Sequence, residues 1–278
     1  MKAAVISGGG AAGAYTVGVM NRLTPDYSFI SGTSTGALMA PLILLRQFGR
    51  LKEAYTSVTN KDVYTWEPFD KKGHVKLFNI VWRQLTQKNT LGDTTAMKKL
   101  IQQFFTQADY DMIAGLGKEF VANMSETRHY PATIVSVSSK DVSYAEMVNA
   151  MWASSNVPVL MSQELKDNYE YADGGLLELF SIKPALERGY KELDVYIHRI
   201  NKAPEDRGST KDLLHNVQRT GSLVKDRLEV YCIQESFRMA QDGGCTLNVQ
   251  WLPEVMQSNY LNFDKEKMKG WYELGFSG

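Results

Sequence analysis

The sequence predicts an α/β domain in which strands and helices alternate along 278 residues. Two segments carry this prediction, because the expected strands at residues 2–7 and 27–31 each lead into a glycine-rich turn and then a helical pattern. Further apolar segments typical of strands follow at residues 119–124, 132–138, 192–200 and 245–252. No internal repeat and no linker rich in Pro, Gly or Ser divides the chain. We therefore expect a single domain over residues 1–278.

Composition excludes several classes of protein. The 31 basic and 31 acidic residues balance, which argues against a general nucleic-acid binder. No apolar run approaches the ~18 residues of a membrane-spanning helix. A strand begins almost at Met1, so we expect no signal peptide and a cytoplasmic protein. We interpret Cys232 and Cys245 as reduced thiols, and a disulfide between them remains an alternative.

The turn after the first strand contains four glycines in six positions, Gly8, Gly9, Gly10 and Gly13, and opens into a helix over residues 14–23. Consecutive glycines let the backbone approach a ligand closely and turn its N–H groups outward. At a helix start, such N–H groups favour an anion or a developing negative charge. The alternative is a tight turn that binds nothing.

The second turn has the spacing Gly32-x-Ser34-x-Gly36, which is typical of a nucleophile elbow. In that geometry a strand turns sharply into a helix and leaves the serine at the apex. Glycines two residues before and after the serine avoid clashes between the strand and the helix. We expect the helix to run from Ser34 to about Phe48 and to be followed by another at residues 50–59.

Residues 60–90 interrupt the alternation of strands and helices. This segment mixes aromatic and cationic side chains, which are Tyr64, Trp66, Phe69, Phe78 and Trp82 among Lys61, Lys71, Lys72, Lys76, Arg83 and Lys88. Such a mixture suits a cap that covers a cleft or makes peripheral contact with a membrane surface. The alternative is an irregular segment whose aromatic residues belong to the core.

The rest of the chain is expected to form further helices and strands. We predict helices at residues 96–105, 146–154, 184–188, 213–241 and 264–274, and a short strand at 144–146. Another strand should end at Asp173, just before Gly174 and Gly175. The polar loop at residues 201–210 and the long helix after it form an expected insertion over residues 201–244.

A serine nucleophile at Ser34 needs a base to take its proton. Histidine is the usual base, but none of His74, His129, His198 and His215 lies in a glycine-flanked loop after a strand. His198 is the best placed of them, although a histidine inside a strand is more often a packed residue. Asp173 lies at a strand end, and burial can raise a carboxylate pKa toward the working range of a base. The competing interpretation of Asp173 with its two glycines is an ordinary turn.

Taken together, the first glycine motif, the elbow at Ser34 and the Asp173-Gly174-Gly175 motif resemble the patatin-like phospholipases, a family of lipid acyl hydrolases. Three further stretches resemble family landmarks in the expected order, namely Leu91-Gly92-Asp93-Thr94, residues 153–158 and residues 184–189. The resemblance covers nearly the whole chain and is weakest at residues 60–90 and 201–244. It implies a three-layer fold with a mostly parallel central sheet flanked by helices.

The resemblance also implies a mechanism without metal or cofactor. Ser34 would be the nucleophile and Asp173 its general base, while the N–H groups of Gly8, Gly9 and Gly10 would form the oxyanion hole. The substrate would be a fatty-acyl ester of a phospholipid, or a related ester if the enzyme is a lysophospholipase or carboxylesterase. Ala12 stands where the family often has Arg or Lys, which weakens the case for a phosphate headgroup.

Two other classes of function compete with this one. The spacing Gly8-x-Gly10-x-x-Gly13 also fits a dinucleotide-binding turn, but the acidic residue expected after the second strand is replaced by the elbow. A catalytically silent lipid-binding protein is the other alternative, and the presence of both Ser34 and Asp173 argues against it. The sequence gives no indication of the oligomeric state.

Overall fold

The computed structural model describes residues 2–66, 90–159, 161, 164–166, 168–202, 209, 213–256 and 260–278. Within these residues, one mixed sheet has the strand order β5-β6-β3-β2-β1-β7-β8, with β4 also paired to β3. The strands are β1 (Ala3–Ile6), β2 (Phe29–Thr33), β3 (Glu119–Glu126), β4 (Thr133–Ser138), β5 (Glu164–Lys166), β6 (Tyr169–Asp173), β7 (Glu192–Ile200) and β8 (Thr246–Leu252).

The centre of the sheet is parallel. Strands β3, β2, β1, β7 and β8 are joined by parallel pairings, whereas β4 and β6 run antiparallel to β3, and β5 runs antiparallel to β6. Parallel strands finish at the same edge of a sheet, which is where open α/β proteins place their ligands. The turns that follow β1 and β2 therefore lie beside each other.

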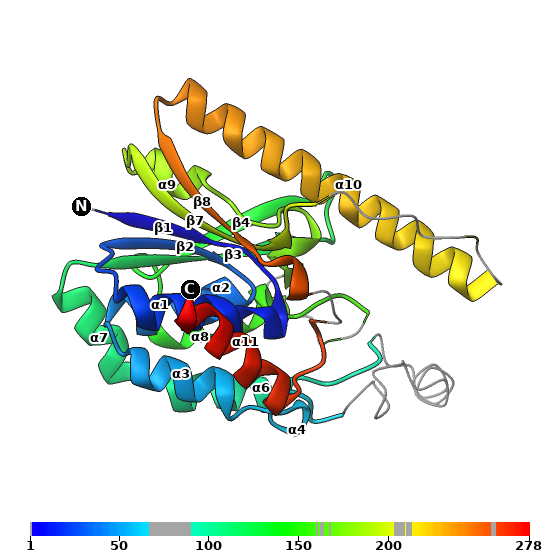
Figure 1. The fold of residues 1–278 in the computed structure, drawn as a ribbon, viewed down its shortest axis with the longest axis horizontal. Helices are drawn as coiled ribbons and strands as arrows, with labels where there is room; N and C mark the ends of the chain where they lie inside the picture. Colours follow the sequence, from blue (N-terminus) through cyan, green and yellow to red (C-terminus); the bar gives the residue numbers. More distant parts are fainter. Residues whose placement is uncertain are drawn as a thin grey trace.

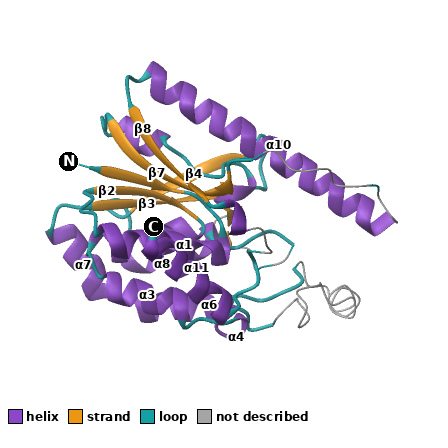
Figure 2. Ribbon diagram, in the orientation of Figure 1, coloured by secondary structure: helices purple, strands orange, loops and turns teal. Residues whose placement is uncertain are grey.

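Helices cover both faces of the sheet (Figures 1 and 2). The larger core cluster packs one face against α1 (Gly13–Leu23), α2 (Thr35–Leu44), α3 (Phe48–Thr56), α6 (Thr95–Phe104), α7 (Gln107–Gly115), α8 (Tyr144–Ser154) and α11 (Lys265–Ser277). The smaller cluster packs the other face against α9 (Lys183–Glu187) and α10 (Leu213–Asp242). Short helices α4 (Asn60–Val63), η1 (Gly10–Ala12), η2 (Gly174–Leu176) and η3 (Glu254–Met256) complete the described elements. The predicted three-layer α/β architecture is confirmed.

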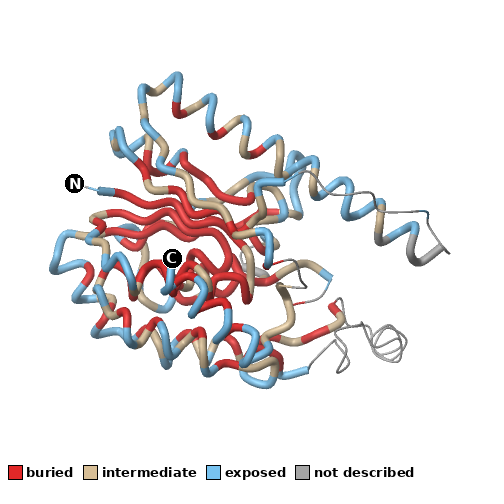
Figure 3. The backbone as a smooth tube through the Cα atoms, in the orientation of Figure 1, coloured by how far each residue is buried: buried red, intermediate tan, exposed pale blue. Residues whose placement is uncertain are grey.

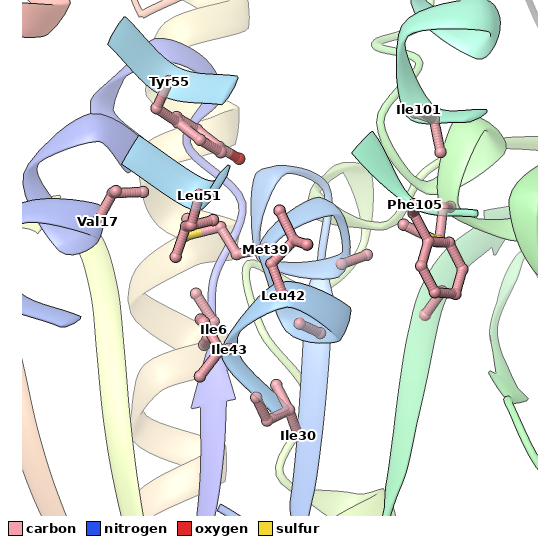
Figure 4. Packing of buried hydrophobic residues seen from close by; sticks show 14 of the residues in the cluster. Ile6, Val17, Ile30, Met39, Leu42, Ile43, Leu51, Tyr55, Ile101 and Phe105 are labelled. Carbon is pink, nitrogen blue, oxygen red and sulfur yellow. The ribbon is translucent and has the colours of Figure 1, made fainter. Parts of the chain in front are cut away.

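Alternation of side chains along β1 explains the two clusters. Ala4 and Ile6 belong to the larger cluster, and Ala3 and Val5 to the smaller one. All four are buried, as expected for a strand with helices on both of its faces. Figure 3 shows the central strands as the most continuously buried part of the molecule, and Figure 4 shows the larger cluster between the sheet and its helices.

The structure differs from the sequence analysis at two places, one wrong strand and one helix that was not predicted. The short strand predicted at residues 144–146 does not form, because Tyr144 is the first residue of α8 and Ser143 caps it. The Ser143 hydroxyl accepts from the Glu146 N–H at 3.4 Å, and a Glu146 carboxylate oxygen accepts from the Ser143 N–H at 3.1 Å. Helix α7 was not predicted, although Thr106 and Asp109 form the same kind of capping box.

In the described part of the expected cap at residues 60–90, one aromatic residue belongs to the core and one lies on the surface. Tyr64 is buried and donates its hydroxyl to the Leu261 carbonyl at 3.2 Å, so it belongs to the core. Trp66 is exposed. Residues 67–89, which hold the other aromatic residues of the segment, lie outside the described residues.

The expected insertion at residues 201–244 is described mainly through α10, since residues 203–208 and 210–212 of its polar loop are not described. Cys232 and Cys245 are both free thiols. Among the helices of the described ranges, none has the length and apolar character needed to span a bilayer.

Candidate active site

The elbow holds Ser34 in a strained conformation between β2 and α2. Its φ of 54° and ψ of −123° lie in a region that residues with side chains rarely adopt. A Cβ atom on Gly36 would lie 2.2 Å from the Ile6 carbonyl oxygen, and one on Gly32 would lie 2.5 Å from the Ala37 nitrogen. The two glycines therefore let α2 pack directly against β1 and β2 and leave the serine at the apex.

Buried polar groups on neighbouring elements hold the elbow in place. The Ser34 N–H donates to the Ser154 hydroxyl at 2.9 Å, and that hydroxyl donates to the Asn123 carbonyl at 2.5 Å. Asn123 in turn donates its side-chain amide to the Gly32 carbonyl at 3.0 Å. Helix α8 and strand β3 thus fix the backbone around Ser34. Sequence reasoning missed the roles of Ser154 and Asn123, because small polar residues near a helix end or in a strand look like ordinary turn or surface residues.

Asp173 ends β6 and is held by its neighbours on several sides. One carboxylate oxygen accepts from the Gly175 N–H at 2.7 Å. The Asp173 N–H donates to the Asn156 carbonyl at 2.8 Å, and its carbonyl accepts from the Ser125 hydroxyl at 3.0 Å. Asn156 is itself tied to the turn before α6, because its side-chain oxygen accepts from Thr94 at 2.6 Å. Two of the stretches that resembled family landmarks therefore meet beside Asp173.

Burial controls the electrostatics of Asp173, whose side chain is almost completely shielded from solvent. It raises the pKa of the carboxyl group to about 6, although hydrogen bonds from the Ser34 hydroxyl and the Gly175 N–H and the charge of Lys225 partly offset the effect. A buried carboxylate with few partners holds a proton more readily than one in water. At neutral pH the group is ionised, and it is basic enough to accept a proton.

The glycine turn after β1 lines the cleft, and its N–H groups differ in their partners. The Gly8 N–H donates to the Leu179 carbonyl at 3.0 Å, and the Ala11 N–H donates to the Tyr260 carbonyl at 2.8 Å. The N–H groups of Gly9 and Gly10 have no hydrogen-bond acceptor among the described residues. Of the three glycines predicted as oxyanion donors, Gly8 therefore differs from Gly9 and Gly10 in having its N–H already engaged.

His198 lies under the glycine turn and is fully engaged there. Its Nδ1 lies 2.9 Å from the Ser7 carbonyl oxygen, which can only accept, so Nδ1 carries the proton and Nε2 accepts from the Thr16 hydroxyl at 2.8 Å. Burial lowers the pKa of this imidazole to about 4. A Cβ atom on Gly9 would lie 2.2 Å from the Cβ of His198, so the ring packs directly under the turn. The interpretation of His198 as a packed residue is therefore favoured.

Of the other histidines, only His129 has a described side chain, and it does not line the site. His129 contacts Glu126 at 3.2 Å in a turn after β3, with its ring half exposed. His74 and the side chain of His215 lie outside the described residues. Within the described part of the chain, no three His, Cys, Asp or Glu side chains gather where they could hold a metal ion.

Two cavities of different character meet at Ser34. The outer one is a cleft with a volume of about 880 Å³, and its walls come from the glycine turn, the elbow, η2, β7 and α10. Its lining includes Ser34 and Asp173, together with the charged residues Arg199, Lys202, Lys225, Asp226 and Glu229. The predicted nucleophile, base and N–H donors are thus brought together in one cleft.

The inner cavity is smaller, at about 100 Å³, and lies between α2, α3, α6 and α8. Leu, Ile, Val, Met and Phe side chains form most of its wall. The hydroxyls of Tyr55 and Thr35 contact each other at 2.5 Å, and Ser155 donates to the Met151 carbonyl at 2.9 Å. Apart from Ser34 at its mouth, the polar side chains of this wall are therefore already paired, so the cavity suits a hydrocarbon chain.

Comparison with known proteins agrees with the motifs. A family model described as patatin-like phospholipase matches residues 4–186, which is most of the chain and includes Ser34 and Asp173. The chain belongs to the patatin-like phospholipase family. Membership of this family supports a hydrolase acting on lipid esters. The matched region ends within α9, so β7, α10, β8 and α11 lie beyond it.

At the level of individual proteins, this chain has a distant structural neighbour and no curated relative. No curated protein matches it. Among solved structures, the crystal structure of VipD from Legionella pneumophila is similar at 13% sequence identity, with a TM-score of 0.46. That similarity covers 99% of this chain and 67% of the VipD chain.

Proposed function

We propose that this patatin-like protein is a serine acyl hydrolase that cleaves fatty-acyl esters of phospholipids or related lipids through Ser34 and Asp173. The observation that supports the proposal most strongly is the position of the strained Ser34 beside the buried carboxylate of Asp173 in one cleft. An elbow of this strain is costly to maintain and is typical of a nucleophile.

The proposed reaction has two stages. The Ser34 Oγ attacks the ester carbonyl carbon while its proton passes to the Asp173 carboxylate. The tetrahedral intermediate then expels the alcohol, which takes that proton from Asp173, and an acyl-enzyme remains on Ser34. Water attacks the acyl carbon in the second stage, Asp173 accepts the proton of the water, and the fatty acid leaves as Ser34 recovers its proton.

The negative charge of the tetrahedral intermediate would be stabilised by the glycine turn. The N–H groups of Gly9 and Gly10 have no acceptor in the described part of the chain, so we propose these two as the oxyanion donors. Each such donor contributes roughly 3 kcal/mol in comparable acyl transfers. Gly8 would take part only as a fixed support, because its N–H is already donated to Leu179.

The two cavities at Ser34 would divide the substrate. The polar side chains in the wall of the inner cavity are already hydrogen-bonded, so a hydrocarbon chain could enter without leaving a polar group unpaired. The acyl chain would therefore enter there. The alcohol part, including any charged headgroup, would occupy the outer cleft beside Arg199 and Lys225. Ala12 is fully buried and carries no charge, so cations of the outer cleft such as Arg199 and Lys225 would take the part of the family's cation.

A fluorophosphonate probe tests the nucleophile. We expect the wild-type protein to be labelled on Ser34, as located by peptide mass spectrometry, and the Ser34→Ala variant to remain unlabelled. Folded wild-type protein that takes up no probe, or that is labelled equally after Ser34→Ala, would refute the proposal. A panel of phospholipids, lysophospholipids, monoacylglycerols and p-nitrophenyl esters would then identify the preferred ester.

The placement of the acyl chain has its own test. Ala54 lines the inner cavity from α3 and is partly exposed, so Ala54→Phe should fill the cavity without removing any contact. We expect kcat/KM for long-chain p-nitrophenyl esters to fall about tenfold while that for the acetate ester is kept. Ala114→Phe on the exposed side of α7 is the matched control. An equal loss on both chain lengths would contradict this placement.

A further inference from the structure

The part of α10 from Val217 to Tyr231 carries an exposed apolar stripe, formed by Val217, Val224, Leu228 and Tyr231. Their exposed fractions are 60%, 56%, 43% and 63%. Successive intervals of seven, four and three residues place all four side chains on one side of the helix. A surface helix normally turns polar residues to solvent, and a continuous apolar stripe on its exposed side marks an interaction surface.

The stripe lies at the entrance to the active site. Val224 and Leu228 also line the outer cleft that leads to Ser34. Leu176 of η2 lines the same cleft and is 41% exposed, and Val159, next to the cleft-lining Pro158, is exposed as well. Figure 1 shows α10 extending past the sheet at the end where the parallel strands finish. Exposed apolar side chains from three separate segments thus surround one opening.

Positive charge accompanies the stripe. Arg199 and Lys225 both contact the carboxylate of Glu229, at 2.8 Å and 3.6 Å, so two cations share one anion. Both also line the cleft beside the stripe, together with Lys202 and Asp226, so its rim carries three cations and two acidic side chains. An apolar stripe beside a rim with a small positive excess matches a lipid surface, where hydrocarbon lies beneath phosphate groups.

We propose that the apolar stripe of α10 and the rim of the cleft dock on the surface of aggregated lipid and place the cleft directly over it. This inference rests on the proposed function, because a long-chain ester is held in such an aggregate. Docking at the entrance would let an acyl chain pass from the aggregate into the apolar cavity without crossing water. The surface would thereby raise the rate on aggregated lipid and leave the chemistry of soluble esters unaffected.

The test uses two stripe residues that do not line the cleft. In a Ser34→Ala background, which prevents lipid hydrolysis, Val217→Gln with Tyr231→Gln should weaken co-sedimentation with vesicles of phosphatidylcholine and phosphatidylglycerol at least about tenfold. Met112→Gln with Leu116→Gln is the matched control, because these are also exposed apolar residues, one on α7 and one at its C-cap. The control should bind vesicles like the parent protein.

Activity provides the second measurement, made with Ser34 intact. The stripe variant should hydrolyse vesicle lipid about tenfold more slowly and a soluble short-chain ester at the wild-type rate. Equal vesicle binding by stripe and control variants would overturn the proposal. So would a wild-type protein that forms dimers lost in the stripe variant, since the stripe would then join two copies. If the wild type cleaves no ester but binds vesicles through the stripe, the proposed function fails and the docking surface stands.

Discussion

Asp173 and His198 are two buried ionisable residues that line the same cleft, and burial acts on both in the same physical way. It favours the neutral form of each, raising the pKa of Asp173 to about 6 and lowering that of His198 to about 4. The difference lies in their partners. Both ring nitrogens of His198 are engaged by Ser7 and Thr16, whereas the Asp173 carboxylate faces the Ser34 hydroxyl. A perturbed pKa indicates a candidate base only where the group also has a reacting partner.

The largest expected effect is the loss of activity on substitution of Asp173, which should far exceed the loss on substitution of His198. Asp173→Asn should lower kcat/KM on a soluble ester on the order of 10³-fold, because the amide cannot accept the proton of Ser34. Its side-chain oxygen can still accept from the Gly175 N–H, so the fold should persist, as circular dichroism would show. Retention of more than about a tenth of the activity would exclude Asp173 as the base.

The pH dependence of the wild-type enzyme should follow Asp173. The base must be ionised to act, so kcat/KM should rise with pH through about 6 and fall about tenfold for each pH unit below that value. The profile is measured with a neutral soluble ester, so that substrate ionisation does not contribute. A profile that is flat between pH 5 and 8 would contradict Asp173 as the base, and a midpoint near 4 would then indicate His198.

The pKa of Asp173 should also affect the stability of the fold, but for stability the ionised form is the unfavourable one. Because the pKa of Asp173 is raised in the folded state, its proton stabilises the fold at low pH, and this contribution is lost as pH rises through about 6. Above that pH the buried charge is a cost, so Asp173→Asn should raise the free energy of unfolding at pH 8 on the order of 2 kcal/mol. Urea titrations at pH 8 and pH 4 would measure it. A variant that is less stable at pH 8 would contradict the burial argument.

The smallest effect on activity is expected at His198. His198→Gln should cost about 1 to 3 kcal/mol of stability, because the Ser7 carbonyl and the Thr16 hydroxyl lose part of their hydrogen bonding. Activity should fall less than about tenfold, through a displaced glycine turn. Should His198→Gln abolish turnover in a folded protein while Asp173→Asn spares it, the roles of the two residues would have to be exchanged.

The sequence was informative where a local pattern carries the geometry. The glycine spacing around Ser34 follows from the contact of α2 with Ile6, and this contact is what the pattern requires. The predicted strand at residues 144–146 is instead the first turn of α8, where Ser143 and Glu146 carry a capping signal that is also local in the sequence.

Other features depend on tertiary approach and leave no local signal. The Gly8 N–H is used by Leu179, which is 171 residues away (179 − 8 = 171) and is brought there only by the folded sheet. The support of Ser34 by Ser154, which lies on α8, is of the same kind. Whether the chain forms one domain, and whether Ser34 and Asp173 act as a dyad, stay predictions.

The family match ends within α9, and residues on both sides of that point in the sequence line the cleft. Ser34, Asp173 and the glycine turn lie before that boundary, whereas Arg199, Lys225 and the apolar stripe lie after it. Substitutions in the later segment can therefore alter which lipid is bound without disturbing the groups proposed to break the ester bond. Inheritance of a reaction and divergence of its substrate can proceed on separate stretches of one chain, and exchange of α10 between relatives would be a direct route to new lipid selectivity.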